Sequence, residues 1–455
     1  MAEREFDVIV VGAGAPGEVC AGRIAGGGLK VGLVENRLVG GECSYYACMP
    51  SKALLRPSEA LAEVRRVPGA AEAVTGELDV SSALRRRDEV IHDLDDESQL
   101  PWLEDKGIEL VRGRGRLDGE RRVRVDGDVL RATKAVVIAT GSEAAMPPIE
   151  GLAEAEPWDN RKATTAKRAP ASLVVLGGGP VGVELAQAWH SFGSDVTLVE
   201  STERLLPGEE PFAGETLAEA FGEAGIGVRT GAKAEAAHRS EGKVRVRLEG
   251  GEELEGEEIL VGVGRRARTE DIGLESVGLN VDGYLEVDDQ LRVDGREWLY
   301  AVGDVNGRAL LTHMGKYQGR IAGDVILGRD ASTRAGAGGP PRVVFTEPQI
   351  AAVGHTLESA TDAGIEARAV DVPTSGTAGA SFYGRNVPGT TRVVIDEGRR
   401  VLVGSTFVGA ETADFLHAAT IAVEAEVPLD RLWHAVPAFP TRSELWLKLL
   451  EEYGL

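Results

Sequence analysis

The sequence predicts an α/β protein in which two similar strand–loop–helix motifs precede a C-terminal α+β domain. The first motif is a buried-strand pattern at residues 6–11 that runs directly into a glycine-rich turn, and the second repeats it at residues 173–176. After a stretch rich in Ala, Gly, Ser and Pro at 330–342, the chain combines further strand patterns with an amphipathic tail. Strands and helices that alternate in this way build parallel, doubly wound sheets. The 455 residues are enough for about two to four domains.

The first motif has the features of a dinucleotide-binding unit. Gly12, Gly14 and Gly17 follow the first strand pattern, and a helical stretch then leads to a second strand pattern that ends at Glu35. Glycines let the backbone approach a pyrophosphate at a helix N-terminus, and an acid about twenty residues later binds the adenosine ribose. We therefore predict that this motif binds a dinucleotide.

The second motif repeats these features. Gly177, Gly179 and Gly182 precede a helix, and the following strand pattern ends at Glu200, at the same offset from the middle glycine as in the first motif. Two such motifs predict two bound dinucleotides. An acid at this position accepts hydrogen bonds from a free ribose 2′-hydroxyl and repels a 2′-phosphate, so NADH is favoured over NADPH. The nearby Arg204 keeps that preference moderate, and NADPH stays possible.

Two of the three cysteines, Cys43 and Cys48, lie in one short segment after the first motif. Residues five positions apart point to different sides of a regular helix, about 140° apart, so a disulfide between them requires a distorted first turn. Strained, accessible disulfides are the labile and catalytic kind. Lys52 lies one turn after Cys48, where its charge favours a thiolate. The alternative is that both cysteines are small buried hydrophobic residues, as we expect of Cys20.

Composition narrows the possible partners. The chain carries 73 acidic and 50 basic residues, for a net charge of -23. Such a surface repels phosphate backbones and anionic lipids, so we expect neither nucleic acid nor membrane as a partner. No apolar run approaches the length of about 18 residues that a membrane span needs, and we expect no signal peptide before the first strand. We expect a cytoplasmic protein without a metal site.

Taken together, the two glycine motifs, the cysteine pair and the C-terminal domain resemble the class I pyridine nucleotide-disulfide oxidoreductases. This flavoprotein group contains dihydrolipoamide dehydrogenase, glutathione reductase and mercuric reductase, and the resemblance covers essentially the whole chain. It implies two Rossmann-like dinucleotide-binding domains, for FAD and NAD(P), and a C-terminal α+β dimerisation domain that forms a homodimer. The expected segments are 1–150 (FAD, with the cysteine pair), 151–267 (NAD(P)), 268–335 (second FAD or central part) and 340–455 (dimerisation).

The resemblance also implies which residues bind the cofactors. The expected FAD contacts are Gly12, Gly14, Gly17, Glu35, Gly41, Glu42, Lys52, Thr140, Gly141, Asp304, Leu311, Thr312 and His313. The expected NAD(P)H contacts are Gly177, Gly179, Gly182, Glu184, Glu200 and Gly264. In this group hydride passes from NADH to the flavin, whose electrons open the disulfide. Cys48 would be the thiol beside the flavin and Cys43 the thiol that exchanges with the acceptor. Lys52 and Glu184 would form an ion pair, the alternative being two unrelated surface charges.

One position departs from the pattern of the group. The histidine base that a partner subunit normally supplies is replaced by Phe439, although Glu444, which normally holds that histidine, is in place. A positioned general base contributes about 10²–10⁴ in rate, so ordinary disulfide reduction should be impaired. His434 is either a substitute base or a structural histidine.

The cysteine segment departs as well. Tyr45 and Tyr46 stand beside Cys43, and Glu42 replaces a threonine that contacts FAD. The tyrosines either give the thiol side an aromatic lining or merely fill volume. The last residues, 449–455, contain no cysteine, which argues against mercury as a substrate.

Three functions stay open. The first, which we expect, is an FAD-dependent oxidoreductase that passes electrons from NADH through the cysteine pair to a disulfide or another acceptor. The second is a quinone reductase in which the flavin itself delivers the electrons. The third is a redox-sensing flavoprotein with little turnover. Phe439 counts against a true dihydrolipoamide dehydrogenase.

Overall fold

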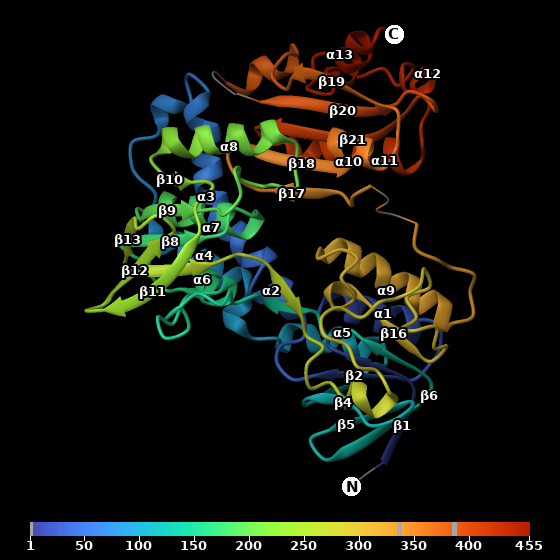
Figure 1. The fold of residues 1–455 in the computed structure, drawn as a ribbon. Helices are drawn as coiled ribbons and strands as arrows, with labels where there is room; N and C mark the ends of the chain where they lie inside the picture. The colour runs from blue at the N-terminus through green and yellow to red at the C-terminus, as the bar shows by residue number, and fades with distance from the viewer. Residues whose placement is uncertain (1–2, 335, 337, 385–388) are drawn as a thin grey trace. The chain divides into compact units, whose positions relative to one another are not determined.

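The computed structural model describes residues 3–334, 336, 338–384 and 389–455 (Figure 1). The chain forms two compact units, each assembled from three segments. Unit 1 consists of Met1–Pro50, Arg87–Ala145 and Gly264–Arg334. Unit 2 consists of Ser51–Arg86, Met146–Val263 and Ala335–Leu455.

Unit 1 is a mixed α/β unit. Its strands are β1 (Glu3–Val11), β2 (Val31–Glu35), β3 (Glu109–Arg112), β4 (Gly115–Leu117), β5 (Arg122–Val125), β6 (Asp128–Ile138), β7 (Ser142–Ala144), β15 (Arg265–Ala267) and β16 (Leu299–Ala301). Its helices are α1 (Ala15–Ala25), α2 (Gly41–Tyr45), α5 (Leu100–Asp105) and α9 (Thr312–Ile326), with 3₁₀ turns η2 (His92–Leu94), η3 (Glu97–Gln99), η4 (Leu274–Val277) and η5 (Gly303–Asn306). Two helices, α3 (Cys48–Arg66) and α4 (Val80–Val90), have residues in both units.

The central sheet of unit 1 has the strand order β3-β2-β1-β6-β5-β4, and β16 pairs with β6. Its middle strand β1 is apolar on both faces. Val8 and Val10 pack in one core with α1, while Ile9 and Val11 pack in another with β4 and β5. Because β1, β6 and β16 are parallel, their carboxyl ends meet at one edge of the sheet, where ligands of such sheets bind.

Helix α9 packs closely on α1 through a row of glycines. A Cβ atom at Gly315 would lie 2.5 Å from Cγ of Pro16, and one at Gly319 would lie 2.6 Å from the carbonyl oxygen of Pro16. At Gly323 it would lie 2.8 Å from Cγ of Arg23. Side chains at these positions would separate the helices, so the glycines fix where the N-terminus of α9 lies.

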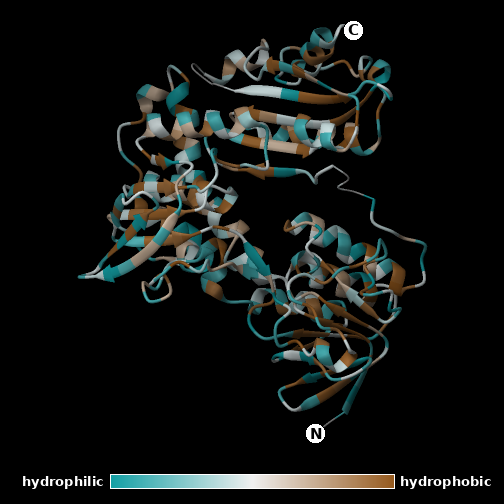
Figure 2. Cartoon of the chain, viewed as in Figure 1, coloured by the Kyte–Doolittle hydropathy of each residue, from teal (hydrophilic) through white to brown (hydrophobic). Residues whose placement is uncertain are grey.

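Unit 2 contains a parallel sheet, a small antiparallel sheet and a C-terminal antiparallel sheet, ordered β10-β9-β8-β14, β11-β12-β13 and β17-β18-β21-β20-β19. Its strands are β8 (Ser172–Leu176), β9 (Asp195–Val199), β10 (Gly227–Arg229), β11 (Ala234–Ser240), β12 (Lys243–Leu248), β13 (Glu253–Gly256), β14 (Glu258–Val261), β17 (Arg342–Val344), β18 (Gln349–Gly354), β19 (Ala367–Pro373), β20 (Thr390–Asp396) and β21 (Val401–Gly409). Its helices are α6 (Asn160–Thr165), α7 (Pro180–Ser191), α8 (Pro211–Ala224), α10 (Leu357–Asp362), α11 (Leu416–Glu424), α12 (Leu429–Leu432) and α13 (Glu444–Tyr453), with η1 (Ala71–Ala73), η6 (Gly379–Tyr383) and η7 (Thr412–Phe415). In both units apolar residues concentrate on the strands (Figure 2).

The predicted α/β fold class, with two repeated parallel motifs and a C-terminal α+β part, is confirmed. Near the end of the segment expected at 151–267, the chain forms strand β15, which pairs antiparallel with β7. Part of the expected linker at 330–342, namely residues 335 and 337, lies outside the described residues. In the described part of the chain, no helix is both long and apolar enough to cross a membrane.

Candidate functional site

The first glycine loop leaves room for a pyrophosphate. Gly12 has a φ of +107°, and a Cβ atom there would lie 2.3 Å from the carbonyl oxygen of Ala139. A Cβ atom at Gly17 would lie 2.0 Å from the carbonyl oxygen of Gly12, whereas one at Gly14 would meet nothing closer than 3.9 Å. Among the described residues, no side chain caps α1 at Gly14. The first N–H groups of α1 are thus left for an anion, which fits the pyrophosphate of FAD.

Glu35 is oriented by backbone N–H groups at the carboxyl end of β2. Its Oε2 accepts from Ala13 N–H at 2.8 Å, and its Oε1 accepts from Arg37 N–H at 2.7 Å. These hydrogen bonds fix a buried carboxylate beside the loop and leave further lone pairs for hydroxyl groups. This arrangement suits the ribose of a dinucleotide.

The second glycine loop, in unit 2, repeats this geometry. Gly177 also has a φ of +107°, and a Cβ atom at Gly182 would lie 1.8 Å from its carbonyl oxygen, while Gly179 faces open space. Glu200 accepts from Gly178 N–H at 2.6 Å through Oε2 and from Thr202 N–H at 2.7 Å through Oε1. The two loops therefore share the positive φ of their first glycine, and in each a glutamate accepts hydrogen bonds from two backbone N–H groups.

The cysteine pair lies at a break between two helices. Helix α2 ends at Tyr45 and α3 begins at Cys48, so the two thiols are on different helices, as the spacing required. The structure shows both as thiols rather than as a disulfide. The hydrogen-bonding contact with Cys48 and burial raise the pKa of Cys43, while Thr312 and Lys316 lower it less. Cys43 therefore holds its proton at neutral pH. Thr312, the first residue of α9, also contacts the second thiol: its Oγ1 lies 3.4 Å from Sγ of Cys48.

Lys52 lies four residues after Cys48 in α3 and forms the expected ion pair with Glu184. Nζ of Lys52 is 2.6 Å from Oε2 of Glu184, whose side chain is 6% exposed. Oε1 of Glu184 accepts from Phe345 N–H at 3.0 Å, and the Lys52 ammonium lies 4.8 Å from the centre of the Phe345 ring. The carboxylate thus joins α3, α7 and the segment after β17 within unit 2.

Other predicted FAD contacts lie at the carboxyl edge of the unit 1 sheet. Thr140 donates from Oγ1 to the carbonyl oxygen of Arg268 at 2.8 Å. Gly141 faces open space beside it. Asp304 lies in η5, shortly after β16, and accepts a hydrogen bond from the Ser142 hydroxyl. Leu311 occupies the N-cap position of α9, and His313 follows Thr312 in the first turn of this helix.

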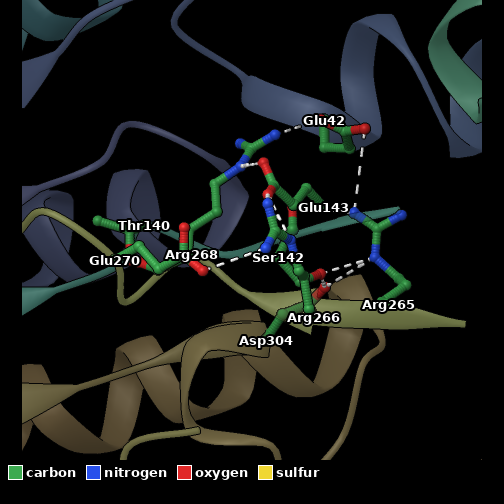
Figure 3. A network of polar contacts seen from close by, with 9 residues as sticks. All are labelled: Glu42, Thr140, Ser142, Glu143, Arg265, Arg266, Arg268, Glu270 and Asp304. Atoms are coloured by element: carbon green, nitrogen blue, oxygen red, sulfur yellow. Dashed lines mark hydrogen bonds and ion pairs between the residues drawn. The ribbon is translucent and has the colours of Figure 1, made fainter. Parts of the chain in front are cut away.

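A charged network surrounds Glu42 in the same unit (Figure 3). Arg265 donates from Nε to the Ser142 hydroxyl at 2.6 Å, and both Arg265 and Arg268 form ion pairs with Glu42. The sequence prediction missed Ser142, Arg265 and Arg268. No local pattern marks them, because the antiparallel pairing of β7 with β15 joins segments 123 residues apart.

The predicted C-terminal site residues lie in unit 2 near α12 and α13. Phe439 is 76% exposed, and His434 is exposed between the two helices. Glu444 begins α13, and its Oε2 lies 3.4 Å from Gly379 N–H, which donates to it. The Glu444 carboxylate therefore contacts the backbone at the start of η6. Among the described residues, no group of three or more His, Cys, Asp or Glu side chains could hold a metal.

Residues 6–319 match the family model described as pyridine nucleotide-disulphide oxidoreductase, and residues 340–449 match the dimerisation domain of the same family. The chain belongs to this family. It is 35% identical over 450 residues to a dihydrolipoyl dehydrogenase of Thermus scotoductus, covering 97% of this chain and 96% of that protein. It is 28% identical over 447 residues to a mercuric reductase of Staphylococcus aureus, covering 97% and 81%.

Solved structures give the same relationship. The HOCl-induced flavoprotein disulfide reductase RclA from Escherichia coli, in its Cu(II) complex, is similar with a TM-score of 0.87 and 25% identity, covering 98% of this chain and 99% of that chain. The predicted family is thus confirmed. As a pyridine nucleotide-disulphide oxidoreductase, the chain is an oxidoreductase of an FAD-dependent family that uses NAD(P)H. The match to the dimerisation domain indicates a homodimer.

One alternative left open by the sequence is now resolved at Tyr45. Its side chain is 1% exposed, and its hydroxyl donates to the carbonyl oxygen of Asp95 at 3.3 Å. Tyr45 therefore fills volume under α2 rather than lining the thiol side. Tyr46 is partly exposed, with its ring centre 6.4 Å from that of Tyr45.

Proposed function

We propose that the protein is an NADH-dependent flavoprotein reductase in which Cys43 and Cys48 alternate between disulfide and dithiol. The observation that carries the proposal is the contact of the two thiols across the α2–α3 break, in the unit that holds the first glycine loop. When bound, FAD supplies two-electron transfer between the nicotinamide and this pair. Two electrons and two protons convert the disulfide into two thiols, and the reverse step reduces the acceptor.

The chain's own residues take distinct parts in this proposal. The Thr312 hydroxyl lies 3.4 Å from the sulfur of Cys48, and in the proposed cycle it donates to that sulfur and stabilises it as a thiolate. Cys43 keeps its proton and is the exchanging thiol. Lys52, oriented by Glu184, presents a fixed positive charge one turn after Cys48. The other predicted roles, including those of His434 and Glu444, and the four predicted domain segments remain proposals.

The preference for NADH follows from the acid at the end of β9. Glu200 is buried and hydrogen-bonded to two backbone N–H groups, so its charge is fixed beside the second glycine loop. A 2′-phosphate placed there would meet a carboxylate at close range. Arg204, the nearby cation, donates instead to the carbonyl oxygen of Pro207 at 3.1 Å. These contacts support NADH over NADPH.

An anaerobic titration of the purified protein with NADH tests the proposal. We expect two electron equivalents to be taken up with a long-wavelength absorbance band that reports a thiolate beside the flavin. Cys48→Ser should remove the band and Cys43→Ser should retain it while abolishing disulfide reduction. Cys20→Ala is the matched control, because Cys20 is buried in the α1 core away from the pair. Bleaching of the flavin without the band would refute the cysteine relay.

The exposed Phe439 at the position of a base favours a second candidate, direct reduction of quinones by the flavin. A quinone accepts electrons without thiol exchange and so needs no base at that position. Quinone reduction that survives in Cys43→Ser with its rate unchanged would support this candidate. Loss of both activities in the same variant would exclude it.

A further inference from the structure

Glu42 lies in a charged cluster that joins two parts of unit 1 distant in sequence (Figure 3). Its Oε1 is 3.9 Å from Nη2 of Arg265, and its Oε2 is 3.8 Å from Nη2 of Arg268. The three side chains are only partly exposed, at 19%, 18% and 30% for Glu42, Arg265 and Arg268. Partial burial strengthens charge interactions at these distances relative to an exposed pair.

Residues of strand β7 hold both arginines by hydrogen bonds. Arg265 donates from Nε to Oγ of Ser142 at 2.6 Å and from Nη2 to its carbonyl oxygen at 3.0 Å. Nε of Arg268 donates to Oε2 of Glu143 on β7 at 3.4 Å. The Ser142 hydroxyl in turn donates to Asp304, so the cluster reaches the predicted FAD-contacting turn. Contacts within the protein therefore hold both guanidinium groups in place.

The start of α2 lies directly against the first glycine loop. A Cβ atom at Gly41 would lie 2.7 Å from Cα of Gly14, and Gly40 N–H donates to the carbonyl oxygen of Ala13 at 2.8 Å. Glu42 is thus one residue from the loop whose free N–H groups fit the phosphates of FAD. A carboxylate in that position repels phosphate unless nearby cations compensate for its charge.

We propose that Arg268, together with Arg265, compensates the charge of Glu42 and so allows an acidic side chain to anchor α2 beside the FAD phosphates. The proposal deepens the proposed function and rests on it in taking FAD as the cofactor of unit 1. Arg268 is here a positioning residue, because it acts on the cofactor through Glu42. Its effect on FAD affinity must then depend on whether Glu42 is charged.

Titration of apoprotein with FAD, followed by quenching of flavin fluorescence, tests this dependence. The four proteins are the wild type, Arg268→Gln, Glu42→Gln and the double variant. We expect Arg268→Gln to raise the FAD Kd about tenfold when Glu42 is present, because Glu42 then keeps only one of the two arginines that face it. In the Glu42→Gln background the same change should alter the Kd by less than about threefold, because no charge is left to compensate.

Two further variants separate compensation from a merely structural role. Arg268→Lys keeps the charge and should bind FAD within about threefold of the wild type. Arg124→Gln is the matched control, since Arg124 of unit 1 pairs with Asp118 at 2.7 Å, outside the cluster, and should leave the Kd unchanged. An equal loss of affinity from Arg268→Gln in both backgrounds, or a loss in Arg268→Lys as large as in Arg268→Gln, would overturn the proposal. A wild-type apoprotein that binds no FAD would overturn the proposed function and this inference with it.

Discussion

Replacing Glu184 by Gln tests the ion pair with Lys52 in isolation. Gln keeps the size of the side chain and an oxygen that can accept from Phe345 N–H, but it removes the negative charge. At the observed 2.6 Å, the gross attraction is about 6 kcal/mol for an effective dielectric constant of about 20. Desolvation of the buried carboxylate cancels most of this, and the Lys52 side chain, at 35% exposure, can be hydrated again in the variant. We expect a net loss of about 1–2 kcal/mol in the free energy of unfolding.

The assay is denaturant unfolding of wild type and Glu184→Gln at pH 7, with the midpoint and slope measured separately. The midpoint should fall while the slope stays constant, because only one interaction changes. Glu215→Gln is the matched control, an exposed Glu on α8 of the same unit. Equal midpoints for wild type and Glu184→Gln would show that the pair contributes nothing net, and the argued balance between attraction and desolvation would be wrong.

Three further predictions follow from single residues. Burial raises the pKa of Glu18 from 4.5 to about 7, so the folded state holds this proton more tightly than the unfolded chain. The stabilising contribution of the Glu18 proton should therefore be complete below pH 4.5 and be lost, by about 3 kcal/mol, as the pH rises to about 7. The difference in the free energy of unfolding between wild type and Glu18→Gln, measured by urea titration, should accordingly move in favour of the variant between about pH 5 and pH 8. A profile unchanged by the substitution would contradict it. Gly182→Ala should abolish NADH binding measured by fluorescence, since the new Cβ would lie 1.8 Å from a backbone oxygen. Gly222→Ala on α8 is the control: its Cβ would meet nothing within 4 Å, so the variant should bind NADH normally and gain about 0.5–1 kcal/mol in the free energy of unfolding. Glu200→Ala should raise the ratio of kcat/KM for NADPH to that for NADH by about tenfold, because the carboxylate no longer repels the 2′-phosphate. An unchanged ratio would show that Glu200 does not select the cofactor.

The features predicted correctly from the sequence are local or repeated. Each glycine loop and its acid lie within one strand–helix–strand segment, so their spacing alone predicts the geometry seen around Glu35 and Glu200. The need for a distorted turn between Cys43 and Cys48 also follows from helix geometry, and the break between α2 and α3 supplies it. These predictions succeed because the residues that contact one another belong to the same short segment of the chain.

Contacts between residues distant in sequence depend on tertiary structure. The ion pair between Lys52 and Glu184 spans 132 residues and was expected only through the family resemblance. The cluster of Glu42 with Arg265 and Arg268 had no such guide, because it depends on the antiparallel pairing of β7 with β15. The short strand β15 was hidden by its charge, since two of its three residues are arginines. Burial could not be judged from composition at Tyr45 either, where an aromatic residue beside a thiol proved to be part of the core.

Phe439 and Cys43 together predict how the rate of thiol exchange depends on pH. The contact with Cys48 and burial raise the pKa of Cys43, so at neutral pH only a small fraction is the reactive thiolate. Phe439 cannot take the proton in place of a histidine. Under the proposed function, the rate of disulfide reduction should rise about tenfold per pH unit between about pH 6 and 9, as expected for a nucleophile far below its pKa.

Phe439→His should raise that rate at pH 7 by up to about 10²–10⁴ and flatten its pH dependence, because a base then removes the proton. The rate of flavin reduction by NADH should stay the same, since that step does not use the exchanging thiol. Phe382→His is the matched control, because Phe382 is also exposed, at 67%, and lies in the same unit. A rate that is independent of pH in the wild type would mean that Cys43 is not the group that exchanges with the acceptor. A gain in Phe382→His equal to that in Phe439→His would show that any added histidine suffices and that position 439 is not special.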